Sequence, residues 1–254
     1  VATYVSARLA TCRIYNLETN ELCGTLELPG EYAALSCPEL KHALDVILDR
    51  LALEADVPLS KVNVAVVSGT TAMESKASNL EESDLLCDLE AELVEFGRDV
   101  EFIMAGTNAI AVGQAYFVPC LNTNVGGDVF CNLLAIDILG AEKPQLFINT
   151  GSHDTSGIVL VYGNRDKLSV CAVPDGVSAK EAMERLLEVC QAEYEHIERT
   201  LVSGDIEVEV PSELRDRTHR VPDAAIEGAS AILLSEMAED ELCRIVSSCH
   251  IVEV

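Results

Sequence analysis

Apolar and polar positions along the first half of the chain follow the spacings of both strands and helices. Pro38 precedes apolar side chains spaced by three and four residues over 38–55, which predicts a helix with one apolar face. Acidic residues and leucines are mixed over 76–96, which predicts a second helix. The other apolar runs are short and bounded by turn residues, and Asn20 lies where a hairpin turn needs a positive φ. These runs predict strands at 1–7, 10–17, 22–28, 61–69 and 100–106.

The second half of the chain repeats this order. Ser178 and Glu181 have the spacing of a capping box, which predicts the start of a long helix over 178–201. Apolar spacing predicts two further helices, at 224–235 and 236–248. Strands are expected at 144–149, 157–163, 167–173 and 250–254.

A three-strand meander followed by helices therefore occurs twice, which predicts an α/β fold of two related lobes. We expect the first lobe at 1–115, with an acidic helical insertion near 76–96, and the second at 116–254. A ligand cleft is expected between the lobes, at the turn joining the first two strands of each. These turns lie at 4–10 and at 149–157.

Composition and charge exclude several classes of function. The 254 residues include 43 acidic and 17 basic side chains, for a net charge of −26. A nucleic-acid-binding protein needs a basic surface, and an anionic membrane surface attracts basic segments, so neither partner is expected. Every long apolar run is interrupted well before the roughly 20 residues of a membrane span. We expect a cytoplasmic protein.

The ten cysteines show no Cys-x-x-Cys pair and no ferredoxin spacing. Most lie in apolar segments, which is typical of small buried side chains in a reducing compartment. No iron–sulfur cluster is expected in this chain. The five histidines do not have metal-ligand spacing either, so no protein-held metal site is expected from them.

The turn at 149–157 has part of what a phosphate-binding loop needs. Gly151 lets backbone N–H groups approach a phosphate, and Ser152 adds a hydroxyl donor. The preceding strand ends in Asn149 and not in a metal-binding carboxylate, although Asp154 lies within the turn. The turn at 4–10 offers only Ser6 as a donor. An ordinary polar hairpin turn and a phosphate loop both remain open.

Two further clusters have the composition of anion sites. Gly69, Thr70 and Thr71 follow a buried strand, and Gly126-Gly127-Asp128 begins a predicted helix, whose N-terminus favours anions. Asp128 and Asp154 are the candidate catalytic acids, because a phosphoryl-transfer site needs a carboxylate to orient the attacking group.

Four stretches, in order, carry a resemblance to the C-terminal actin-like ATPase (ASKHA) domain of reductive activators of corrinoid proteins. They are "VVSGTTAM" (66–73), "VPCLNTNVGGDV" (118–129), "LFINTGSHDTSGIVLVYGNRDKL" (146–168) and "PDAAIEGASAILLSE" (222–236). The resemblance implies two RNase H-like lobes, each a mixed sheet with crossover helices, and a cleft between them. It also implies binding of ATP and Mg, with Gly228 near the adenosine, a corrinoid or other metalloprotein as partner, and a homodimer.

Departures from the family pattern affect the phosphate loops most. Tyr4 and Asn149 stand where the family has aspartates, Ser6 stands where it has glycine, and Pro222-Asp223 replaces Gly-Asn. We expect no ferredoxin-like module of the family within this sequence, in line with its cysteine spacing.

Two functions therefore remain open from the sequence. One is a diverged ATPase domain that activates or docks its partner through a weakened nucleotide site. The other is a non-catalytic dimerisation or partner-binding module that has lost ATP binding. A small-molecule kinase of the same superfamily is a weaker third alternative.

Overall fold

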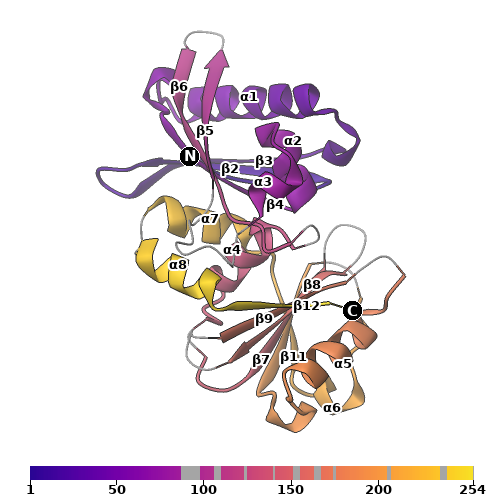
Figure 1. Cartoon of the computed structure of the whole chain (residues 1–254). Coiled ribbons are helices and arrows are strands. Elements are labelled where there is room, and N and C mark those ends of the chain that lie inside the picture. Colours follow the sequence, from indigo (N-terminus) through magenta and orange to yellow (C-terminus); the bar gives the residue numbers. More distant parts are fainter. Residues whose placement is uncertain are drawn as a thin grey trace.

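The computed structural model describes residues 1–86, 98–105, 110–122, 125–139, 141–150, 155–162, 167–173, 176–204, 207–234 and 239–253. These residues form two six-stranded mixed sheets with helices between them and on their outer faces (Figure 1). Within the described ranges, no helix is both long and apolar enough to cross a membrane.

The first sheet has the order β3-β2-β1-β4-β6-β5. Its first three strands form an antiparallel meander, β4 adds to β1 in parallel, and β6 adds to β4 in parallel. Asn20, in the turn between β2 and β3, has a φ of 57°, as the sequence predicts. The strands are β1 (Ala2–Val5), β2 (Leu9–Asn16), β3 (Glu21–Pro29), β4 (Val64–Gly69), β5 (Arg98–Ala105) and β6 (Ile110–Phe117).

The second sheet repeats this arrangement in the order β11-β10-β7-β8-β9-β12. An antiparallel meander comes first, then β10 adds to β7 and β11 to β10, both in parallel. The repeated plan predicted from the hydrophobic pattern is confirmed. The strands are β7 (Gln145–Thr150), β8 (Thr155–Tyr162), β9 (Lys167–Ala172), β10 (Arg199–Ser203), β11 (Thr218–Val221) and β12 (Cys249–Val252).

The helices form three layers around the two sheets. Helix α1 covers the outer face of the first sheet, α5 covers the outer face of the second, and α4, α7 and α8 lie between the sheets (Figure 1). The described helices are α1 (Cys37–Glu54), α2 (Thr71–Ser78), α3 (Glu82–Leu85), α4 (Gly127–Ala135), α5 (Ala179–Val189), α6 (Ser212–Arg215), α7 (Ala225–Leu233) and α8 (Glu239–Ser247). Short 3₁₀ turns occur at Tyr32–Ala34, Leu59–Lys61 and Tyr194–His196.

The middle layer joins the two halves of the chain through one apolar core. Ala2 and Val66 of the first sheet belong to the same buried cluster as Phe147 and Val159 of the second. Helix α7 belongs to the second half of the sequence but contacts β1 and β4 of the first sheet. Strand β6 continues to Phe117, just past the predicted boundary at 115/116. That division into 1–115 and 116–254 stays a prediction.

The predicted helix over 178–201 is wrong in its second half. Helix α5 ends at Val189, and Gln191 then takes a left-handed conformation with φ 53°, which stops the helix. Residues Arg199–Ser203 form β10, because Leu201 and Val202 are buried on opposite faces of the second sheet. Strands β6 and β11 were not predicted. Only part of the predicted helix over 76–96 lies in the described ranges, where it is divided between α2 and α3.

Close contact between α4 and α7 depends on Gly228. A methyl group at this position would overlap the backbone carbonyl of Cys131 in α4. Glycine therefore lets the two helix backbones approach each other in the layer between the sheets.

We predict that Gly228→Ala destabilises the protein by roughly 1–3 kcal/mol, because the overlap forces two packed helices apart. Urea unfolding followed by circular dichroism measures this change. Gly157→Ala is the matched control, since a methyl group there first meets the end of the Val125 side chain, at 3.2 Å. Equal losses in the two variants would contradict this role of Gly228.

Candidate functional site

Polar side chains from both halves of the chain meet where the middle layer approaches the ends of strands β1 and β7. Tyr4 lies near the end of β1, and Asn149 near the end of β7. Asp128 lies in the first turn of α4, and Asp223 precedes Ala224, the N-cap of α7. Four separate segments therefore supply this group.

Asp128 is buried, with 3% of its surface exposed. Its Oδ2 atom accepts a hydrogen bond of 3.2 Å from Asn149 Nδ2, whereas its Oδ1 atom has no hydrogen-bond partner within the described residues. Burial, and then the nearby charge of Asp223, raise the pKa of Asp128 from 3.8 to about 7. A carboxyl group in this state is half protonated near neutral pH.

Tyr4 connects the first sheet to the segment before α7. Its hydroxyl donates a hydrogen bond of 2.7 Å to Asp223 Oδ2, across 219 positions of sequence. Burial raises the pKa of Tyr4 well above its ordinary value, and the carboxylates of Asp223 and Asp128 raise it further. The phenol therefore stays protonated and remains a donor.

Asn132 ties the same carboxylate to α4. Its Nδ2 atom donates to Asp223 Oδ1 at 3.1 Å, and its Oδ1 atom accepts from the backbone N–H of Ala224 at 2.8 Å. The N–H of Ala225 also donates to Asp223 Oδ1, at 3.1 Å. Both oxygens of this exposed carboxylate thus have donors in the protein.

Arg13 of β2 and Glu227 of α7 form a second polar connection between the first sheet and α7. Their ion pair has an N–O distance of 2.6 Å, and the side chains are 21% and 47% exposed. An ion pair at this exposure contributes less than about 1 kcal/mol.

Glu74 of α2 holds the turns that surround the start of α4. It is fully buried, and its Oε1 atom accepts a hydrogen bond of 2.8 Å from the backbone N–H of Gly69. The Cys120 thiol donates to its Oε2 atom at 3.5 Å. Burial raises the pKa of Glu74 well above its ordinary range, and the carboxyl group of Asp128 raises it further.

The structure brings together the two glycine clusters predicted as cofactor-binding. A methyl group at Gly126 would lie 2.6 Å from Thr70 Cα and 2.7 Å from Thr71 N, and one at Gly127 would lie 2.6 Å from Glu74 Oε1. Close packing of the two turns therefore requires glycine at both positions. A role of Gly69, Gly126 and Gly127 in binding a ligand stays a prediction.

The hydroxyl groups predicted to bind a cofactor have partners inside the protein. Thr71 donates to the carbonyl of Asn122 at 2.8 Å, and Thr70 accepts from the N–H of Met73 at 3.4 Å as the N-cap of α2. Ser6 stabilises the turn after β1. Its hydroxyl accepts from the N–H of Leu9 at 3.0 Å and donates to the Leu9 carbonyl at 3.2 Å.

Of the other predicted site residues, Gly228 lies in the contact between α4 and α7 described above. Gly151, Ser152 and the second candidate acid, Asp154, lie outside the described residues. Asp128 is thus the candidate catalytic acid that the structure describes.

The described residues do not fit the phosphates of Mg-ATP. Phosphate needs cations or free N–H and O–H donors, whereas this region presents the carboxyl groups of Asp128 and Asp223, which repel a phosphate that no metal ion bridges to them. The hydroxyls of Ser6 and Thr71 already donate to backbone carbonyls, and the Thr70 hydroxyl accepts a hydrogen bond as the N-cap of α2. We therefore derive no reaction step through a bound nucleotide.

Sequence reasoning missed the roles of Asn132, Glu74 and Asp223. Asn132 lies four positions after Asp128, so helical spacing alone places both on one face of α4. Glu74 is an acid in a helix whose buried positions the short, mixed sequence of α2 does not reveal. Asp223 was noted only as a departure from a motif, because its partner Tyr4 is remote in sequence.

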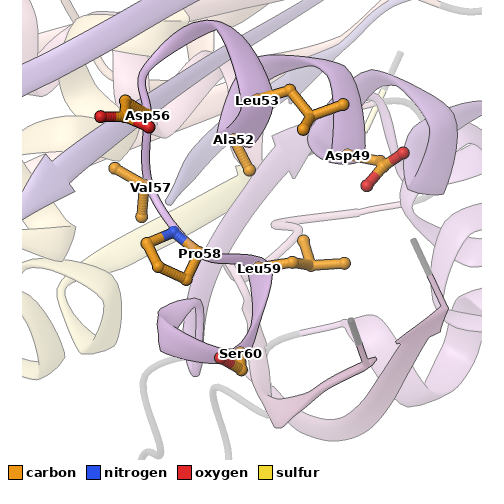
Figure 2. A pocket seen from close by; sticks show the side chains of 8 residues that line it. All are labelled: Asp49, Ala52, Leu53, Asp56, Val57, Pro58, Leu59 and Ser60. Atoms are coloured by element: carbon orange, nitrogen blue, oxygen red, sulfur yellow. The ribbon is translucent and has the colours of Figure 1, made fainter. Parts of the chain in front are cut away.

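The surface hollow shown in Figure 2 lies away from this site, where α1 ends and the chain turns toward β4. Its volume is about 370 Å³, and its residues all come from one continuous segment. They are Asp49, Ala52, Leu53, Asp56, Val57, Pro58, Leu59 and Ser60. None of the predicted site residues lines it.

Solved structures that resemble the chain include the following two. One is a reductive activator for corrinoid, iron–sulfur protein, with a TM-score of 0.69 and 14% sequence identity over 99% of this chain and 62% of that chain. The other is an inorganic polyphosphate/ATP-glucomannokinase from Arthrobacter sp. strain KM, with a TM-score of 0.42 and 11% identity over 92% of this chain and 98% of that chain. No protein-family model and no curated protein sequence matches the chain.

The chain thus spans less than two thirds of the length of the activator. At this sequence identity, the likeness shows the fold alone. Together with the two repeated mixed sheets, it is consistent with the two-lobed fold of actin-like ATPases. The predicted fold class is confirmed.

We predict that Asp128→Asn flattens the pH dependence of stability. Below about pH 4, Asp128 is protonated in both the folded and the unfolded state, so its contribution to the free energy of unfolding is fully present. Between about pH 4 and 7 only the folded state holds the proton, so stability falls as pH rises toward the folded pKa of about 7.

Urea unfolding at pH 5 and pH 8 tests this prediction. The free energy of unfolding of Asp128→Asn, relative to the wild type, should rise between these pH values by roughly 2–4 kcal/mol. Asp216→Asn, at an exposed aspartate after α6, is the control and should follow the wild type. A constant difference between Asp128→Asn and the wild type at both pH values would refute the raised pKa.

Proposed function

We propose that the chain is a diverged actin-like ATPase domain that docks a corrinoid or other metalloprotein partner, with a nucleotide site too weak for turnover. The partner class is taken from the reductive activator for corrinoid, iron–sulfur protein, whose fold matches nearly the whole chain. Because the chain spans only 62% of that protein, reduction of a partner would require groups other than those described here.

The observation that carries this proposal is the presence of neutral side chains at the ends of β1 and β7. Tyr4 and Asn149 occupy these positions, and each forms a hydrogen bond with an aspartate of the middle layer. Phosphoryl transfer depends on metal ions, which carboxylates hold in place, to neutralise the charge that develops on the phosphates. Neutral side chains at both strand ends support loss of hydrolysis with retention of the fold.

A non-catalytic dimerisation module is the second candidate. Ile110 and Val112 of β6 are 62% and 56% exposed, and Val64 of the neighbouring β4 is 38% exposed. The strand register places these three side chains on one face of the sheet. Exposed apolar positions grouped in this way favour a protein contact. Sedimentation equilibrium tests this candidate, because a chain that stays monomeric cannot be a dimerisation module.

We predict that the purified chain binds Mg-ATP and Mg-ADP with a dissociation constant above about 1 mM. This value corresponds to a binding free energy weaker than about −4 kcal/mol. Engaged donors and buried acids both oppose phosphate binding. Isothermal titration calorimetry measures the affinity, and phosphate release measures turnover. Micromolar binding together with turnover would contradict the weakened site.

We also predict that the chain binds a corrinoid protein carrying cob(II)alamin, and does not bind free cob(II)alamin. A docking domain recognises the surface of the partner protein, whereas the cofactor alone lacks that surface. Biolayer interferometry with the immobilised chain measures both affinities. Absence of binding to corrinoid proteins would refute the proposed partner class and leave the nucleotide prediction untouched.

A further inference from the structure

We propose that the two lobes of this protein are held together without nucleotide, by a link in which Tyr4 and Asn132 donate to the carboxylate of Asp223. This inference goes beyond the proposed function, because it concerns how the lobes are held and not what they bind. The three residues come from β1, α4 and the segment before α7, and they are called the Asp223 link below.

Geometry makes this link a connection between the first sheet and the middle layer. The Tyr4 hydroxyl lies 2.7 Å from Asp223 Oδ2, and Asn132 Nδ2 lies 3.1 Å from Asp223 Oδ1. Asn132 also accepts from the backbone N–H of Ala224, so both sides of its amide hold the same segment. Hydrogen bonds to a charged acceptor are stronger than those between neutral groups.

Charge explains why a tyrosine suits this position. An aspartate at position 4 would place a third carboxyl group beside Asp128 and Asp223, and that arrangement would need a bound cation to neutralise it. The Tyr4 phenol supplies a donor in place of a charge. Strand β1 and the segment before α7 are therefore joined without a metal ion or a phosphate.

Other contacts also join the two sheets to the helices between them. Asn149 Nδ2 donates to Asp128 Oδ2, which joins β7 of the second sheet to α4. The ion pair of Arg13 and Glu227 joins β2 to α7. Apolar side chains of both sheets share one core around α4 and α7. All of these contacts are made by the chain itself.

Hydrogen–deuterium exchange on the full chain, with Tyr4→Phe, tests the Asp223 link. Loss of a hydrogen bond to a charged group should accelerate exchange in peptides covering 2–5 and 222–233 by roughly tenfold or more. Tyr32→Phe is the matched control, because the Tyr32 hydroxyl donates to the Leu28 carbonyl within the first lobe, at 3.0 Å. Exchange in these peptides should be unchanged by the control.

Asp223→Asn is a second variant, which keeps an acceptor but removes the charge, and it should give an intermediate acceleration. In parallel, small-angle X-ray scattering of the wild type should give the same radius of gyration with and without 5 mM Mg-ATP. Two results would overturn the proposal. One is equal exchange in Tyr4→Phe and Tyr32→Phe, and the other is contraction of the wild type on addition of Mg-ATP.

Neither of these two results would bear on whether the chain binds a corrinoid protein. Binding of a corrinoid protein is measured on the intact chain, and it can fail while the Asp223 link is fully supported. Conversely, a lobe arrangement that depends on nucleotide would overturn the link without excluding a corrinoid partner.

Discussion

The contact between α4 and α7 determines the arrangement of the centre of the molecule. Gly228 lets the helix backbones meet at Cys131, and the two helices then fill the space between the sheets. Helix α4 carries Asp128 and Asn132, while the segment entering α7 carries Asp223. The distance between the two helices therefore fixes the distances among the acidic groups, and a change in helix packing changes the site.

Acidic groups buried in this layer need donors, because an isolated buried carboxylate is strongly destabilising. The protein supplies such a donor to the buried Asp128 from Asn149, and the exposed carboxylate of Asp223 accepts from Tyr4 and Asn132. Protonation provides a second solution, since burial raises the pKa values of Asp128 and Glu74. Both solutions stabilise the region without a cation, and both leave few donors for an anionic ligand.

Glycine and threonine clusters show that residue types alone do not distinguish a ligand-binding role from a packing role. Such residues are suited to phosphate loops, and they are equally suited to two backbones in close contact. Gly126 packs against Thr70 and Thr71, and Gly228 packs against Cys131. The sequence predicts that these positions are special, but only the neighbouring backbone shows what they contact.

The amino-acid sequence alone determines the two meanders, the helices that follow them and the start of α4. Each of these is specified locally, by the spacing of apolar residues and by capping residues. The length of α5 and the existence of β10 depend on tertiary structure, since Leu201 and Val202 form a strand only when β7 is alongside. The same holds for the site. Tyr4 and Asp223 are 219 positions apart, and no local pattern connects them. Their hydrogen bond exists because the fold places the end of β1 against the start of α7.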